Sequence, residues 1–285
     1  MRLVGDLRPA AYQLVPLTKL LTNEHRSLLI CDGVGVGKTI SAGYILTFLT
    51  ASKRQPGLVI CPASLQEKWF FELRTKFDLN VLPIRSSEEF DFTVDEWNEL
   101  GHSHRVYILP MSVVTRVRPT TFLGPVVIDE IHNCRNSDTQ LWKAMKGFTK
   151  DATYRIGLSA TPINNGIVDL ASIFSILIDT DYHIADALIQ DLWRPDRRHL
   201  LYPLMTRFVK ERLSLHFARR DVYDQHVEYP DAYLDQVIAT VKALRDRPRN
   251  ERFYRDEITY FRLSTSSPRA FRVSTGVAIE NASKK

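Results

Sequence analysis

Near the start of the chain, nine residues have the types and spacing of a phosphate-binding loop. They run from Cys31 to Thr39 as Cys-Asp-Gly-Val-Gly-Val-Gly-Lys-Thr, between an apolar run that predicts a strand and a segment that predicts a helix. Glycines let successive backbone N–H groups converge on an anion, and a helix N-terminus adds positive potential. Lys38 could then reach the β- and γ-phosphates of a nucleoside triphosphate, while the Thr39 hydroxyl could bind Mg²⁺.

One position departs from the strict phosphate-loop pattern. That pattern has glycine five residues before Gly37, and Asp32 stands there. For this segment alone, the alternative is a glycine-rich turn that precedes a helix for structural reasons. Segments farther along the chain decide between the two interpretations.

Two carboxylates follow a later apolar run and could hold the metal that a bound triphosphate requires. Val126–Ile128 predicts a strand, and Asp129 and Glu130 come directly after it. The first carboxylate of such a pair holds Mg²⁺, often through water, and the second polarises the attacking water. A strand that simply meets solvent at Asp129 is the alternative. Strand and helix patterns separate the pair from Lys38, as a nucleotide-binding domain requires, and the two motifs together favour the metal site.

Three further polar residues could serve the same site. Ser159 and Thr161 follow the predicted strand 154–158, at the edge where open parallel sheets bind ligands, and could sense the γ-phosphate through the acidic pair. An ordinary loop is the alternative for that segment. The amide of Gln13 has a donor and an acceptor that match an adenine edge, although by itself the residue is better explained as a polar position on an amphipathic helix.

The elements that must position these residues alternate along the first part of the chain. Strand and helix patterns follow one another over residues 1–180, which predicts an α/β fold with a parallel sheet and helices on both faces. Beyond about 181 the pattern changes to helices with basic residues. Residues 194–220 contain eight Lys or Arg and two acidic residues. A helix is expected over 231–245 and a hinge near 264–268.

Composition bounds the class of protein. The 285 residues are 44% hydrophobic and 25% charged, as in ordinary globular domains, and no run approaches the roughly 20 apolar residues of a membrane span. Three cysteines without paired spacing argue against disulfides and a metal site, and indicate buried thiols in a reducing compartment. We therefore expect a cytoplasmic protein without membrane contact. The net charge of +5 arises in residues 194–285, which suggests a polyanionic partner or, alternatively, solvated helix faces.

Taken together, the segments resemble the first motor lobe of superfamily-two helicases, and most closely the Swi/Snf-like ATPases of the bacterial, RNA-polymerase-associated type. The segments that carry this resemblance are Leu7–Pro9 with Gln13, Asp32–Thr39, Ile60–Leu65 with Trp69, Asp129–His132 and Leu158–Asn165. That family tolerates aspartate at the position of Asp32. The segments that resemble its helical protrusion and the approach to its second lobe are Phe208–Arg212, Phe217–Arg220 and Thr265–Phe271.

The resemblance implies a domain organisation and residue roles. It implies a RecA-like ATP-binding lobe over 1–180, a basic helical protrusion over 181–262 and a hinge or linker towards a second lobe over 263–285. The residues implied in binding ATP and Mg²⁺ are Arg8 and Gln13 near the adenine, Gly35, Val36, Gly37, Lys38 and Thr39 at the phosphates, and Thr39 with Asp129 at the metal. The implied catalytic residues are Lys38, Asp129 and Glu130, the last as the base. The implied coupling residues are His132, Ser159 and Thr161, and those implied to approach a nucleic-acid backbone are Ser64 and Ser112.

The chain also departs from that family. Gly33 replaces a common acidic residue, and Ser159–Thr161 is closer to the general helicase form than to the Gly-Thr of Swi/Snf proteins. The sequence stops about where a second RecA-like lobe is expected to begin, and that lobe supplies an arginine finger worth about 10³–10⁵ in rate in related NTPases. We therefore expect these residues alone to bind ATP weakly and to hydrolyse it poorly.

Three functional hypotheses result. The leading one is the ATP-binding lobe of a nucleic-acid-dependent ATPase, a translocase or helicase acting on double-stranded DNA, with the second lobe and further proteins as partners. The alternative is a non-catalytic module that binds ATP or nucleic acid and comes from a split or truncated gene. A small-molecule kinase with a phosphate loop is the third, but it leaves Asp129–His132 and the basic C-terminal third unexplained.

Overall fold

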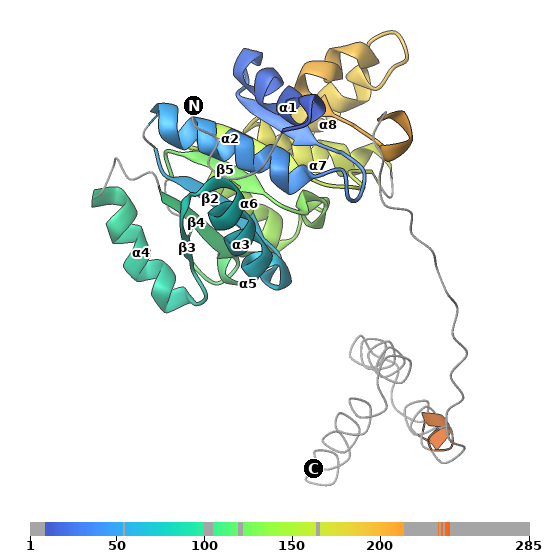
Figure 1. Ribbon diagram of the computed structural model, residues 1–285. Coiled ribbons are helices and arrows are strands. Elements are labelled where there is room, and N and C mark those ends of the chain that lie inside the picture. The colour runs from blue at the N-terminus through green and yellow to red at the C-terminus, as the bar shows by residue number, and fades with distance from the viewer. Residues whose placement is uncertain are drawn as a thin grey trace. The chain divides into compact units, whose positions relative to one another are not determined.

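A computed structural model describes the larger part of the chain (Figure 1). The described residues are 9–53, 55–99, 105–118, 122–163, 166–213, 233, 235 and 237–239. The chain divides into two compact units, Met1–Phe217 and Ala218–Lys285, and nearly all of the described residues belong to the first. Among the described residues, no helix has both the length and the apolar character that crossing a bilayer demands.

A parallel sheet forms the centre of the first unit. Its strands are β1 (Ser27–Ile30), β2 (Gly57–Cys61), β3 (Asn80–Pro83), β4 (Arg105–Pro110), β5 (Pro125–Ile128), β6 (Tyr154–Leu158) and β7 (Met205–Thr206). Their order across the sheet is β3-β4-β2-β5-β6-β1-β7, and every neighbouring pair is parallel. The predicted α/β fold with a parallel sheet is confirmed.

Helices cover both faces of this sheet (Figure 1). The α-helices are α1 (Ala11–Thr22), α2 (Lys38–Lys53), α3 (Gln66–Phe77), α4 (Ser87–Glu99), α5 (Met111–Val114), α6 (Gln140–Thr149), α7 (Ile167–Leu177) and α8 (Tyr182–Leu192). The short 3₁₀ turns are η1 (Ala63–Leu65), η2 (Ile131–Cys134), η3 (Arg198–Leu204) and η4 (Lys210–Arg212).

The two-residue period of the strands separates the core into two layers. In β1, Leu28 and Ile30 face α1, α2 and α3, whereas Leu29 belongs to the cluster on the opposite side, with α6 and α7. The same alternation occurs in β2, where Val59 and Ile60 belong to different clusters. Side chains of successive strand residues point to opposite faces, so a fully apolar strand packs against helices on both sides.

The sheet extends into a part of the chain that the sequence assigned to the helical protrusion. Strand β7 lies beyond residue 180 and pairs with β1, with Leu29 opposite Met205. The buried Ile189 of α8 and Leu204 of η3 join the same core cluster as α7. The described residues up to Thr206 therefore pack on the sheet domain. Most of the helix expected over 231–245 and the hinge or linker expected over 263–285 lie outside the described residues.

The three cysteines are free and buried, as the sequence predicted. Burial is the main cause that raises the pKa of each thiol, of Cys31, Cys61 and Cys134, to about 12. A thiol with so high a pKa carries almost no thiolate at neutral pH and is a poor nucleophile.

Candidate nucleotide-binding site

The predicted phosphate loop connects β1 to α2, and its backbone has the geometry that an anion cradle needs. Gly35 and Gly37 adopt φ angles of 76° and 103°, in the left-handed region that glycine enters without strain. Helix α2 then begins at Lys38, and the N–H groups of Ile40 and Ser41 donate to the Gly37 carbonyl at 2.9 and 3.0 Å. The helix N-terminus with its unpaired first N–H groups thus follows directly after the glycines.

The lysine of the loop lies over the loop itself. Lys38 Nζ donates to the Asp32 carbonyl at 2.9 Å and lies 3.5 Å from the Gly33 carbonyl. An ammonium group held there is available to exchange these carbonyls for phosphate oxygens. The next residue, Thr39, is half-buried in the first turn of α2.

Asp32 has a structural partner that the sequence did not indicate. Its side chain is 1% exposed, and its Oδ1 accepts a hydrogen bond of 2.8 Å from the Phe208 amide, 176 residues away. Burial raises the pKa of the Asp32 carboxyl, and the Phe208 amide and the Lys38 ammonium lower it less. The aspartate therefore fastens the loop to the segment that follows β7, which explains why this position is not glycine.

The predicted metal site lies at the end of β5. Asp129 is 7% exposed, and its Oδ2 accepts a hydrogen bond of 2.8 Å from Trp69 Nε1, while its Oδ1 accepts one of 2.9 Å from the Glu130 amide. Glu130 itself has a φ of 49°, a left-handed conformation that is strained for a residue other than glycine. Such strain is common where a side chain must be aimed at a ligand.

Trp69 is a functional candidate whose role sequence reasoning missed. The sequence placed it on the apolar face of a helix, and it lies there, 1% exposed, in the core cluster of α1, α2 and α3. Its indole N–H reaches the Asp129 carboxylate across the end of the sheet. The one available signal was that a buried tryptophan needs an acceptor for its N–H.

A short polar chain joins the ends of β5 and β6. His132 Nδ1 lies 3.1 Å from Glu130 Oε2 and 3.2 Å from Ser159 Oγ. The Ser159 hydroxyl oxygen in turn accepts a hydrogen bond of 3.1 Å from the Thr161 amide. The structure thus brings together the predicted base and the three predicted coupling residues, although their roles stay predictions.

The residues predicted near the adenine contact the loop from the side of α1. Gln13 Oε1 accepts a hydrogen bond from the Ala10 amide at 3.1 Å, and a Cβ added to Gly37 would lie 2.9 Å from Gln13 Nε2. The Tyr12 hydroxyl donates to the carbonyl of the buried Val36 at 2.8 Å. Gln13 is therefore packed against the phosphate loop, and its contact with adenine stays a prediction. Arg8 lies outside the described residues.

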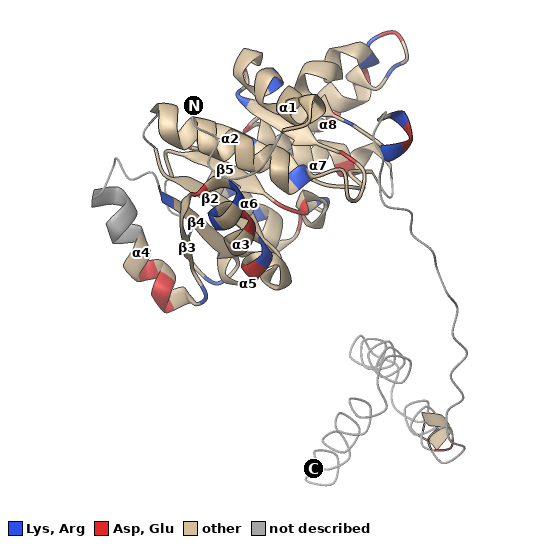
Figure 2. Cartoon of the chain, in the orientation of Figure 1, with Lys and Arg blue, Asp and Glu red and all other residues tan. Residues whose placement is uncertain are grey.

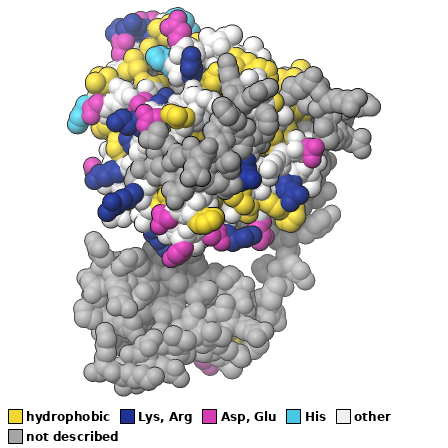
Figure 3. Space-filling view, turned by 90° about the vertical axis from the view of Figure 1, so that its left-hand side faces the viewer, with side chains coloured by type: hydrophobic (Ala, Val, Ile, Leu, Met, Phe, Trp, Pro, Cys, Tyr) yellow, Lys and Arg dark blue, Asp and Glu magenta, His cyan; other side chains and the backbone are white. Residues whose placement is uncertain are grey.

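The two serines predicted to approach nucleic acid are exposed. Ser64 lies in η1 after β2, and Ser112 lies in α5 after β4. Because β2 and β4 are parallel neighbours, both serines follow the same edge of the sheet as Asp129. On the face shown in Figure 3, the Lys and Arg side chains of described residues are interspersed with acidic and hydrophobic ones.

A parallel α/β domain with a glycine-rich loop and lysine after one strand, and an Asp-Glu pair after another, defines the class of phosphate-loop nucleotide-binding lobes. The profile of the SNF2-related domain matches residues 13–225, and the chain therefore belongs to the SNF2-related domain family.

The chain is also similar in sequence to known proteins. The chain is 29% identical over 174 residues to the uncharacterized ATP-dependent helicase YqhH of Bacillus subtilis, covering 59% of this chain and 29% of that protein. It is 26% identical over 195 residues to the ISWI chromatin-remodeling complex ATPase ISW1 of Saccharomyces cerevisiae, covering 66% and 17%. The chain thus spans less than a third of these relatives.

A solved structure has the same fold. The SWI2/SNF2 ATPase core of Sulfolobus solfataricus, in complex with double-stranded DNA, superposes with a TM-score of 0.57 at 19% identity. The superposition covers all of this chain and 67% of the other. At this identity the likeness concerns the fold alone.

Proposed function

We propose that this chain is the ATP-binding lobe of a nucleic-acid-dependent ATPase that moves along double-stranded DNA. One observation carries the proposal. The phosphate loop, the Ser159 segment and the Asp129–Glu130 pair follow β1, β6 and β5, three strands that are consecutive neighbours in the parallel sheet. Their functional groups therefore converge at one carboxyl edge, where open α/β sheets bind ligands.

The residues at this edge fit ATP and Mg²⁺. In the proposed site Lys38 neutralises the phosphates, Thr39 and Asp129 hold the metal, and Glu130 accepts a proton from the attacking water. Bound Mg²⁺ would neutralise charge that develops on the phosphate oxygens. Trp69 orients Asp129 through its indole hydrogen bond, and His132 links Glu130 to Ser159. Gln13 contributes to nucleotide recognition beside the loop.

The DNA partner and the second lobe are part of the same proposal. The solved structure with the same fold is a complex with double-stranded DNA, the relatives are longer than this chain, and the C-terminal third is basic. Closure of two lobes around ATP and their reopening would move the protein along the phosphate backbone, which carries no sequence information. A cytoplasmic location is likewise proposed, in keeping with three free thiols.

ATP turnover in the presence of nucleic acid tests this function. The chain is assayed alone and together with a second lobe, encoded in frame or by a neighbouring gene, while duplex DNA, single-stranded DNA and RNA are titrated. We expect turnover that requires the second lobe, rises with duplex DNA and falls steeply with salt, since phosphate contacts release counterions. Lys38→Ala and Glu130→Gln should each abolish it.

The other outcomes have defined meanings. Unchanged turnover in both variants would refute the catalytic assignment. ATP binding without turnover under any of these conditions would favour the non-catalytic module. A turnover rate that none of the nucleic acids changes would favour a small-molecule kinase.

A further inference from the structure

The segment that follows β7 is fastened along the phosphate loop by backbone hydrogen bonds. The Cys31 amide donates to the Thr206 carbonyl and the Gly33 amide to the Phe208 carbonyl, both at 2.8 Å. The Phe208 amide donates to the Asp32 carboxylate, also at 2.8 Å. Three hydrogen bonds over three loop residues leave this segment little freedom to move away from the loop.

An aromatic contact holds the same segment from the other side. The rings of Phe208 and Tyr12 lie 5.6 Å apart at an angle of 58°. The Tyr12 hydroxyl also donates to the Val36 carbonyl, inside the phosphate loop. Phe208 is therefore fixed by both its backbone and its side chain, which sets the position of the residues directly after it.

Two residues farther on, the side chain of Lys210 reaches the loop. A Cβ added to Gly35 would lie 2.9 Å from Lys210 Nζ and 3.1 Å from Lys210 Cε, so the ammonium group lies against Gly35. Gly35 is three residues before Lys38. The basic turn η4 that carries Lys210 is visible as a blue, red and blue segment in Figure 2.

We propose that Lys210 is a second cationic ligand of the nucleotide's phosphates, beside Lys38. This proposal rests on the proposed binding of ATP by the loop. An ammonium has three rotatable donors on a flexible stem, so Lys210 can turn from the edge of Gly35 to a phosphate oxygen without moving its backbone. Because the side chain is exposed, water and salt screen its charge, and its contribution is smaller than that of Lys38.

Nucleotide affinity of the full chain tests the proposal without reference to turnover. ATP, ADP and AMP are titrated with Mg²⁺ by calorimetry into wild type, Lys210→Ala, Lys210→Arg and Lys38→Ala. We expect Lys210→Ala to weaken ATP binding by about threefold to tenfold, as for an exposed charged hydrogen bond, and AMP binding less. Lys210→Arg should stay within about twofold of wild type, because it keeps the charge and the donors.

A matched control removes the same charge from the same turn. Arg212→Ala leaves Lys210 in place, so ATP affinity should remain within about twofold of wild type. The deficit of Lys210→Ala should shrink as salt is raised from 50 to about 300 mM, because salt screens an exposed charge. Equal melting temperatures without nucleotide show that the variants are folded.

Two results would overturn the inference, and they differ in what else they overturn. If wild type binds ATP, Lys38→Ala does not, and Lys210→Ala binds as tightly as wild type or more tightly, Lys210 is not a ligand while the proposed function stands. If wild type itself fails to bind ATP, the proposed function and this inference fall together.

Discussion

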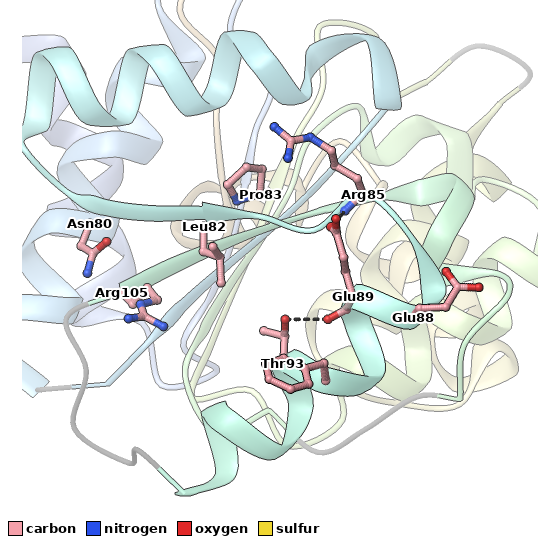
Figure 4. Close-up of a pocket in the computed structure, with 9 residues that line it drawn as sticks. Asn80, Leu82, Pro83, Arg85, Glu88, Glu89, Thr93 and Arg105 are labelled. Carbon is pink, nitrogen blue, oxygen red and sulfur yellow. Dashed lines mark hydrogen bonds between the residues drawn. The ribbon is translucent and has the colours of Figure 1, made fainter.

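Two regions of the lobe contain charged side chains: the carboxyl edge of β5, β6 and β1, and the pocket between β3 and α4. The burial and the hydrogen-bond partners of these side chains differ between the two regions. At the edge, Asp32 and Asp129 are almost fully buried, and each carboxylate accepts a hydrogen bond from a group distant in sequence. The pocket of about 730 Å³ lies at the other end of the sheet order (Figure 4). Its Glu88, Glu89 and Arg85 are exposed.

The bonds within the pocket are local. The Arg85 amide donates to Glu89 Oε2 at 2.6 Å, and the Thr93 hydroxyl donates to the Glu89 carbonyl at 2.6 Å (Figure 4). The pKa of Glu88 is lowered chiefly by its hydrogen bond with Ser86. These contacts start and continue helix α4, as side chains at a helix N-terminus commonly do. In this lobe, the candidate catalytic residues are therefore marked by buried carboxylates whose hydrogen-bond partners are distant in sequence. The volume of a cavity does not mark them.

The largest expected effect concerns the helix that walls the pocket. Phe90 is 2% exposed and stacks edge-on against Phe148 at 5.6 Å, so Phe90→Ala should lower the free energy of unfolding by about 3–5 kcal/mol. ATP affinity of the folded protein should stay within about twofold. Urea unfolding and calorimetry measure the two quantities.

The neighbouring Phe92 provides the control for that substitution. It lines the pocket and is 81% exposed, so Phe92→Ala should change stability by no more than about 0.5 kcal/mol. A strong loss of ATP affinity in either variant would mean that the pocket and the edge are not separate, and the comparison would fail.

A smaller loss of stability, but a direct effect on the site, is expected at the edge. Trp69→Phe keeps most of the ring and removes the donor to Asp129, which should cost about 1–3 kcal/mol and weaken the Mg²⁺ dependence of ATP binding. Titration of Mg²⁺ at fixed ATP measures this dependence.

Trp142→Phe is the matched control, because it also removes an indole hydrogen bond, from Trp142 Nε1 to the Ser172 carbonyl at 3.1 Å. Trp142 lies in α6 and donates to a carbonyl of α7 rather than to Asp129, so its replacement should lower stability without changing the response to Mg²⁺. If ATP binding by Trp69→Phe depends on Mg²⁺ as it does in wild type, Trp69 does not support the metal site.

The smallest expected effect is a pH dependence carried by Asp32. Its pKa is raised, mainly by burial, so the folded chain binds this proton more tightly than the unfolded chain does. The stability it contributes is present below the unfolded-state pKa and is lost as pH rises through the folded-state pKa. Asp32→Asn keeps an acceptor for the Phe208 amide. It should remove the contribution of Asp32 to the slope of the free energy of unfolding against pH on the acid side.

Urea unfolding over a series of pH values, from below the ordinary pKa of an aspartate upward, measures that slope. Asp138→Asn, on an exposed loop, serves as the control and should leave the slope as in wild type. A slope that Asp32→Asn leaves unchanged would show that burial does not perturb this carboxyl.

Much of the lobe was predictable from the sequence, because its signals are local. Short apolar runs predicted β1, β5 and β6, and the glycine spacing predicted the phosphate loop. Local backbone preferences and side-chain periodicity determine such features, whatever lies elsewhere in the chain. The Asp-Glu pair after β5 belongs to the same class of signal.

Only the tertiary structure decided which distant groups meet. Strand β7 has two residues and therefore no periodicity, and pairing with β1 makes it a strand. The partners of Asp32 and Asp129, Phe208 and Trp69, lie 176 and 60 residues away in sequence. Packing of helices on the sheet and closure of the intervening loops bring them together, and no local pattern records that outcome. Asp32 looked like a flaw in the loop's sequence, and its partner shows that it fastens the loop to the rest of the lobe.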